Sequence, residues 1–126
     1  MEEALRTLLL GNTAIAALVG TRVDWGMRPQ GSALPAICLT TINDGPVNHT
    51  LDGPGPSRAR VQIDCFGASY GSAKTVARAV RRLLDTYSSG PIMGVFLAGA
   101  RDLSDDSDVT VIHGVSLDFF INYTFN

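Results

Sequence analysis

Residues 57–66, SRARVQIDCF, and residues 67–88, GASYGSAKTVARAVRRLLDTYS, follow each other directly and decide the fold. In the first stretch small or apolar residues alternate with polar ones, so the period of two predicts a β-strand from Ser57 to Phe66 with one face in water. In the second stretch apolar residues recur every three or four positions, which predicts an amphipathic helix from Ser69 to Ser88. Such a pair indicates a helix that lies on a sheet by its apolar stripe.

A second strand and a breaker-rich connection precede this pair. Ala36 to Asn43 is rich in apolar and β-branched residues, which predicts a strand. The connection from Asp44 to Pro56 contains DGP and DGPGP, and neither a helix nor a continuous strand accommodates so many breakers. Because one connection joins the two strands, we expect an antiparallel hairpin with an extended loop at residues 44–56.

The two ends of the chain add further helix and strand. A helical period runs over Glu2–Val19, with Gly11 and Asn12 marking a kink. The last predicted strand, Val109–Phe125, would exceed ~50 Å at about 3.3 Å per residue, so we expect a bend near Gly114 or an overhang onto a neighbour. The remaining predicted segments are the strands Arg22–Trp25 and Ile92–Ala100 and the acidic loop Arg101–Asp108.

These segments predict an α+β fold. We expect a mainly antiparallel sheet of about four to five strands with two helices packed on one face. A chain of 126 residues, 45% of them hydrophobic, can form one domain that spans residues 1–126.

The charge and apolar content argue against several kinds of partner. A net charge of -2 leaves no positive excess to hold a phosphate backbone, so nucleic acid is not an expected ligand. A charged fraction of 17% is low, which suggests that other subunits cover part of the surface. No apolar run approaches the ~18 residues of a membrane helix, and the acidic start MEE is unlike a signal peptide. Cys38 and Cys65 are expected to be buried thiols without a disulfide.

Each motif that resembles an active site fails on spacing or on partners. Residues 67–75, GASYGSAKT, do not have the spacing of a phosphate-binding loop, and an N-cap at Ser69 or Ser72 explains them. His49 and His113 have no recognisable nucleophile beside them. Two histidines and two cysteines without close pairing do not form a zinc site, so we expect no metal and no cofactor.

Two charged clusters each leave two interpretations open. The acidic run from Asp102 to Asp108 lacks the order of a calcium loop, and it is either solvated or a contact for a basic partner. The arginines of the predicted helix are either its wet side or, with those of the preceding strand, a basic patch that faces an acidic neighbour. The helix contributes Arg78, Arg81 and Arg82, and the strand contributes Arg58 and Arg60.

The order of several short motifs resembles the tail-completion, or tail-terminator, family of long-tailed bacteriophages and gene transfer agents. The helix at Ala73–Leu84 and the long closing strand also fit the family, so the resemblance extends from end to end. The matching motifs are ALVGTRV (17–23), RPQG (28–31), LPAI (34–37), TLDG (50–53) and ARVQIDCF (59–66).

The resemblance implies a structural protein and not an enzyme. In this family a small α/β subunit assembles as a ring, usually a hexamer, that caps the finished tail tube and stops further addition of tube protein. The other side of the ring joins the tail to the head connector, and DNA passes through the lumen without specific binding. Such a protein is assembled in the bacterial cytoplasm and lies at the head-proximal end of the tail. No catalytic residue, metal, cofactor or membrane comes with the resemblance.

Two segments are the candidates for contact with the tube protein or with neighbouring subunits, namely the hairpin loop and the acidic loop. A monomeric or dimeric α/β ligand-binding domain is the alternative, and it would need a pocket with convergent polar groups. A small hydrolase is a third possibility, and it would need a paired nucleophile and base. The candidate contact residues are Asn48, His49, Leu51, Asp52, Arg101, Asp105, Asp106 and Asp108.

Overall fold

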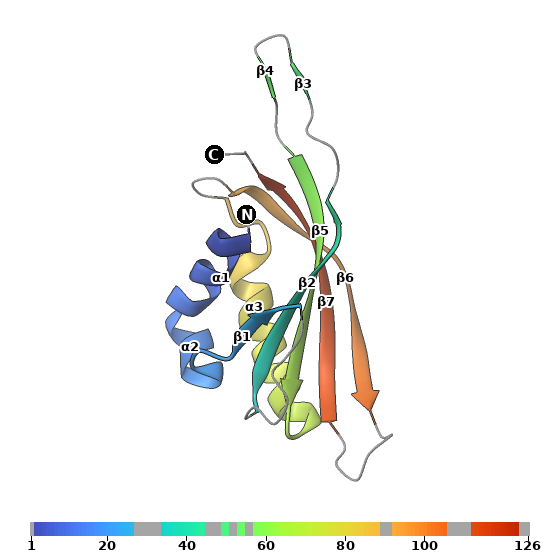
Figure 1. Ribbon diagram of the computed structural model, residues 1–126. Coiled ribbons are helices and arrows are strands. Elements are labelled where there is room, and N and C mark those ends of the chain that lie inside the picture. Colours follow the sequence, from blue (N-terminus) through green and yellow to red (C-terminus); the bar gives the residue numbers. More distant parts are fainter. Residues whose placement is uncertain are drawn as a thin grey trace.

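The computed structural model describes residues 2–26, 34–44, 49–50, 53–54, 57–88, 92–105 and 112–123. Helices form one layer and a long, twisted sheet forms the other (Figure 1). The elements are α1 (Glu2–Gly11), α2 (Thr13–Val19), β1 (Val23–Trp25), β2 (Ala36–Asp44), β3 (His49–Thr50), β4 (Gly53–Pro54), β5 (Ser57–Gly67), α3 (Tyr70–Leu84), β6 (Ile92–Asp105) and β7 (Ile112–Tyr123).

The main sheet has five strands in the order β1-β2-β5-β7-β6. β1 runs parallel to β2, and every other neighbouring pair is antiparallel. The predicted α+β class, with a mainly antiparallel sheet, is confirmed. The predicted antiparallel hairpin is also confirmed, because β2 pairs with β5 from Ala36↔Phe66 to Asp44↔Ala59.

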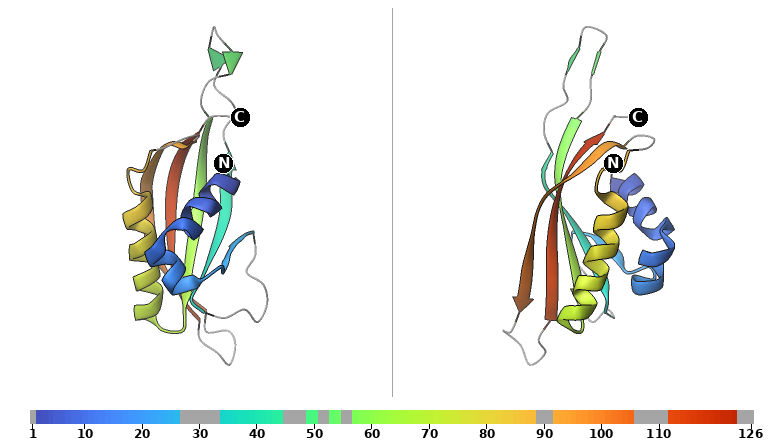
Figure 2. Two further views of the ribbon diagram at one scale, coloured as in Figure 1. Left: turned by 90° about the vertical axis from the view of Figure 1, so that its left-hand side faces the viewer. Right: turned by 180° about the vertical axis from the view of Figure 1, so that it is seen from behind.

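The helices lie on one face of the sheet and leave the other face open (Figure 2). The predicted kink separates α1 from α2, where the side chain of Asn12 caps α2 by accepting a hydrogen bond from the backbone N–H of Ile15 at 3.1 Å. The buried stripe of α3 packs on the core-facing side of β5 and β7, as the helical period predicts. That stripe consists of Ala73, Val76, Ala77, Val80 and Leu84.

The core lies between these two layers. Its largest fully buried side chains include Leu5 and Ile15 from the helices and Phe119 from β7. Each such side chain contributes about 1.5–3 kcal/mol by leaving water, so the sequence alternation of β5 and β7 directly sets which face meets the helices.

A tight turn connects β5 to α3. The Ser69 side chain accepts a hydrogen bond from the backbone N–H of Ser72 at 3.1 Å, which confirms the predicted N-cap. A Cβ atom at position 67 would lie 2.6 Å from the backbone nitrogen of Ala73, so only glycine fits there. Gly67 and the Ser69 cap therefore shape the turn that starts α3.

α3 ends earlier than the sequence predicts. The helix stops at Leu84, four residues before the predicted end at Ser88. Thr86 has a φ of 64°, which a continuing right-handed helix does not accept. The backbone N–H of Thr86 instead donates to the carbonyl of Val95, so pairing with β6 replaces the last predicted turn.

β6 is longer than predicted, and the acidic loop is correspondingly shorter. The prediction that Arg101 to Asp105 belongs to a loop is wrong, because β6 pairs with β7 as far as Asp105↔Ile112. These polar residues are tolerated since β6 is an edge strand and ladder hydrogen bonds to β7 satisfy its backbone. Residues 106–108 lie outside the described residues.

β7 covers residues 112–123 of the predicted strand 109–125, and the remaining positions lie outside the described residues. Its ladder with β5 passes Gly114 without a register shift. The register shifts of this half of the sheet lie in β6, between Ile92 and Gly94 and between Leu97 and Gly99.

β3 and β4 form a small ribbon within the breaker-rich connection. Their register is His49↔Pro54 and Thr50↔Gly53, so short strands interrupt the predicted loop. Figure 1 shows this ribbon beyond the end of the sheet at which β5 begins, away from the helices.

Candidate functional site

The side of the sheet opposite the helices carries the polar side chains of β5. Along β5 the residues that face the helices are buried, whereas Arg58 and Arg60 are exposed and Gln62 and Asp64 are half-buried. The prediction of one wet face is therefore confirmed. We call the side of the sheet opposite the helices the open face.

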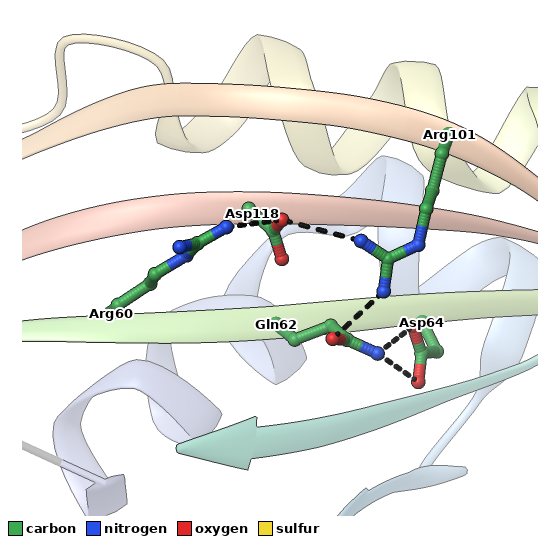
Figure 3. A network of polar contacts seen from close by, with 5 residues as sticks. All are labelled: Arg60, Gln62, Asp64, Arg101 and Asp118. Carbon is green, nitrogen blue, oxygen red and sulfur yellow. Dashed lines mark hydrogen bonds and ion pairs between the residues drawn. The ribbon is translucent and has the colours of Figure 1, made fainter. Parts of the chain in front are cut away.

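A polar network crosses the open face, and the Asp118 carboxylate on β7 lies at its centre (Figure 3). Arg60 on β5 forms an ion pair with Asp118 over 3.0 Å, measured from Nη2 to Oδ2. Arg101 on β6 reaches the same oxygen over 3.6 Å through Nη1. Three adjacent strands thus contribute one charged group each to a single site.

The network continues from Arg101 toward β5. The Nη2 group of Arg101 donates to Oε1 of Gln62 at 3.1 Å. The Nε2 group of Gln62 donates in turn to the Asp64 carboxylate at 3.0 and 3.1 Å. The amide of Gln62 is therefore fixed from both sides, and the guanidinium of Arg101 is held flat over the sheet.

Solvent exposure differs strongly between the partners. The Asp118 side chain is 10% exposed, whereas those of Arg60 and Arg101 are 44% and 54% exposed. Because the carboxylate is mostly buried, removal of Arg60 alone would leave it without its nearest partner, whereas the guanidinium groups would remain accessible to water. Both guanidinium groups keep N–H donors that a partner can use.

Two buried oxygen atoms under the network have no hydrogen-bond donor among the described residues. They are Oδ1 of Asp118 and Oγ of Ser116, both on β7. A buried polar atom without a partner costs about 1–3 kcal/mol, so a hydrogen-bond donor added at either oxygen would be stabilising.

Apolar groups surround the network. Phe96 is 51% exposed and lies opposite Phe120 in the β6–β7 ladder. The Arg58 guanidinium lies 4.0 Å from the centroid of the Phe120 ring, a distance typical of a cation–π contact. A shallow hollow of about 520 Å³ adjoins this pair, lined by Ile42, Asn43, Arg58, Ala59, Arg60 and Phe120.

The arginines of α3 and those of β5 do not form a common patch. The possibility that all five form one basic patch is wrong, because Arg58 and Arg60 belong to the open face while α3 covers the opposite face. Arg78, Arg81 and Arg82 are exposed and line a separate shallow hollow of about 390 Å³ with Asp85.

A third polar cluster joins the start of α3 to β6. The Tyr70 hydroxyl donates to Asp102 at 3.0 Å, and Lys74 Nζ lies 3.2 Å from the same carboxylate. These hydrogen bonds, first from Lys74 and then from Tyr70, hold the pKa of Asp102 below its usual value. Hydrogen bonds that Lys74 makes, first with Tyr70 and then with Asp102, raise the pKa of Lys74. The cluster ties a helix end to the edge strand.

The described residues offer little for covalent chemistry. Cys38 and Cys65 are buried and form no disulfide, as the sequence predicts. Burial, with a smaller effect of the neighbouring Asp64 charge, raises the pKa of Cys65 far above its usual value, so this thiol stays protonated. Within the described ranges no group of three His, Cys, Asp or Glu residues could hold a metal ion. None of the described helices is both long and apolar enough to cross a membrane.

The structure describes three of the predicted contact residues, and it does not bring them together. Arg101 belongs to the network, Asp105 ends β6 and His49 begins β3. The ribbon that starts at His49 and the end of β6 lie far apart (Figure 1). Asn48, Leu51, Asp52, Asp106 and Asp108 lie outside the described residues.

Sequence reasoning missed the centre of the open face. Asp118 stands between Leu117 and Phe119 in an apolar strand, where a charged residue signals a partner across the sheet. Arg60 and Asp118 are 58 positions apart in the sequence. Identifying Arg60 and Arg101 as the partners of Asp118 therefore requires the pairing register of three strands.

Two comparisons find relatives of this chain. The sequence profile of the family described as "Tail completion protein gp17" matches residues 3–121. Among solved structures, a chain in the virion of a native gene transfer agent particle superposes with a TM-score of 0.70 and 22% sequence identity. That superposition covers 98% of this chain and 93% of the other, and at this identity it shows a shared fold. No curated protein sequence matches the chain.

Proposed function

Since the chain belongs to the tail completion protein gp17 family, we propose that it is the tail-terminator subunit that closes the tail tube of its particle. The family makes it a structural component of a phage-type tail. In the proposed role, six copies of the chain form a ring, as the family resemblance implies. This ring caps the tube and stops its polymerisation. The exposed side of this ring then receives the head connector.

The observation that carries this proposal is the extent of the family match. Residues 3–121 are matched, so nearly every described element belongs to the shared architecture. We propose that residues 1–126 act as one domain, with the connection at 44–56 as its projecting arm.

The ribbon of β3 and β4 supports a role in contact between molecules. A ladder of two residue pairs is too short to be stable by itself in water, and it gains stability by packing against another surface. We propose that Asn48, His49, Leu51 and Asp52 meet the tube protein or a neighbouring subunit. Asp105, Asp106 and Asp108 would then make contacts at the end of β6, and Arg101 would make contacts at the open face.

A structural role without catalysis is the simplest account of the polar groups. The ion pairs of the open face join strands to each other, and the Asp102 cluster joins a helix to a strand. A net charge of -2 suits a ring through which DNA slides, since a strongly basic lumen would retain phosphates. We place the ring at the head-proximal end of the tail, after assembly in the bacterial cytoplasm.

A ligand-binding domain is the competing function. Its expected feature is a concave site with convergent polar groups, whereas the hollows at β5 and at α3 are shallow and open. No observation favours this alternative over the family assignment.

The mass of the purified chain, measured with and without tail tubes, tests the proposal. Tubes assembled from the tube protein of the same particle should retain about six copies at one end of each tube, in agreement with the proposed ring. A chain that stays monomeric with tubes present, and does not bind them, contradicts the proposal. A monomer without tubes is compatible with it, since such a ring can form by mass action on its template.

A further inference from the structure

We infer that the open face of one copy is covered by α1 and α2 of the next copy. This interface rests on the proposed ring function, and it identifies the two surfaces that build the ring.

The layer arrangement supplies the first argument. A closed cyclic ring of more than two copies needs heterologous contacts, in which two different surfaces of each subunit meet. The helices cover one face of the sheet and leave the opposite face open (Figure 2). Packing the open face of one copy on the helices of the next is a contact of this kind, and around a closed ring it gives every sheet a cover on both sides.

The composition of the open face supplies the second argument. Its exposed groups combine arginines with large apolar side chains, namely Arg60, Arg101, Phe96 and Ile42. Arginine and aromatic residues are enriched in subunit interfaces, whereas lysine and glutamate are depleted. The sole lysine of the chain is Lys74 on α3, and its two glutamates are on α1.

Charge identifies which helices cover the face. Among the described residues of the open face, the exposed charged side chains are Arg58, Arg60 and Arg101. The carboxylates of this face belong to Asp24, Asp64 and Asp118, and they are half-buried or buried. The first turn of α1 carries Glu2 and Glu3, both exposed, and α2 carries no charged residue.

α3 is excluded as the cover by the same reasoning. Its exposed arginines, Arg78, Arg81 and Arg82, would meet the arginines of the open face. Like charges that face each other across an interface disfavour association. The acidic start of α1 therefore fits the open face, and the outer side of α3 does not.

The surface of α2 also fits by shape. Its exposed residues are Thr13, Ala14 and Ala17, whose short side chains let the helix approach closely. The rings of Phe96 and Phe120 would pack against them and lose contact with water.

A charge swap tests the interface. The variants Arg58→Glu and Glu3→Arg each place like charges across the proposed contact, and we expect each to raise the midpoint concentration of ring assembly on tubes about tenfold or more. The double variant restores opposite charges and should assemble within about threefold of the unmodified chain. Arg82→Glu on α3 is the matched control, because it reverses an equally exposed arginine outside the interface.

A photo-crosslinker at Phe96 provides a second readout that does not depend on affinity. Crosslinks should join position 96 of one copy to the tryptic peptide Thr7–Arg22 of another, which contains α2. Crosslinks that map to α3, to the open face of another copy or to the tube protein would overturn the inference. So would normal assembly of both single variants.

The outcomes separate this inference from the proposed function. If the unmodified chain forms no ring on tubes, both ideas fall together. If the unmodified chain forms a ring but the charge swap and the crosslinks fail, the interface is wrong and the tail-terminator function stands.

Discussion

Arg60 and Asp118 form an ion pair across β5 and β7 in which the cation is 44% exposed and the carboxylate 10% exposed. Removal of one partner should therefore affect the stability of the fold more than removal of the other. Loss of the carboxylate leaves guanidinium groups that water can solvate. Loss of Arg60 leaves a mostly buried carboxylate with the longer contact to Arg101.

Substitution of these two residues should show that inequality. Arg60→Met should lower the free energy of unfolding by about 1–2 kcal/mol, since it strands a buried charge. Asp118→Asn keeps the shape and removes the charge, so it should cost less than about 1 kcal/mol. Urea unfolding followed by circular dichroism measures both values. Equal costs, or a larger cost for Asp118→Asn, would show that the pair is not organised around a buried carboxylate.

Gly67→Ala should destabilise the junction between β5 and α3. The added Cβ would lie 2.6 Å from a backbone nitrogen, which cannot move without shifting the start of the helix. We expect a loss of about 1–3 kcal/mol in thermal or urea unfolding. Gly11→Ala is the matched control, because no atom lies within 4 Å of the added carbon. Comparable losses in the two variants would refute the close approach at Gly67.

The cluster of Asp102, Lys74 and Tyr70 predicts that the stability of the fold depends on pH in the acidic range. The pKa of Asp102 is lowered in the folded chain, so the contact stabilises the fold above the unfolded pKa. That stabilisation is lost as the pH falls through the lowered pKa. An NMR titration of the Asp102 side chain should show the depressed pKa in the unmodified chain and a higher pKa in Lys74→Met. An unchanged Asp102 pKa in that variant would rule out Lys74 as the main cause.

Local patterns in the sequence predicted the elements well. The alternation of residues 57–66 and the helical period after Ser69 are both set by burial, so they appear directly in the order of residues. The kink at Asn12 was also visible, because its capping group lies only three residues from its partner. These features depend on neighbours along the chain.

Features that depend on pairing between strands far apart in the sequence could not be predicted from local patterns. The extension of β6 through Arg101 comes from pairing with β7, which overrides the polar character of that segment. The early end of α3 comes from the hydrogen bond between Thr86 and Val95. The Asp118 network needs the register of β5, β7 and β6 together, and no local pattern encodes that register.

The central claim is that this chain ends the growth of a tail tube. Its most direct test is the length of tubes grown from purified tube protein, measured by electron microscopy with the chain present in small molar amounts. We expect the tubes to stop growing at one end and to carry a ring of additional density there. Tubes that grow to the same length with and without the chain, and carry no such ring, would contradict it.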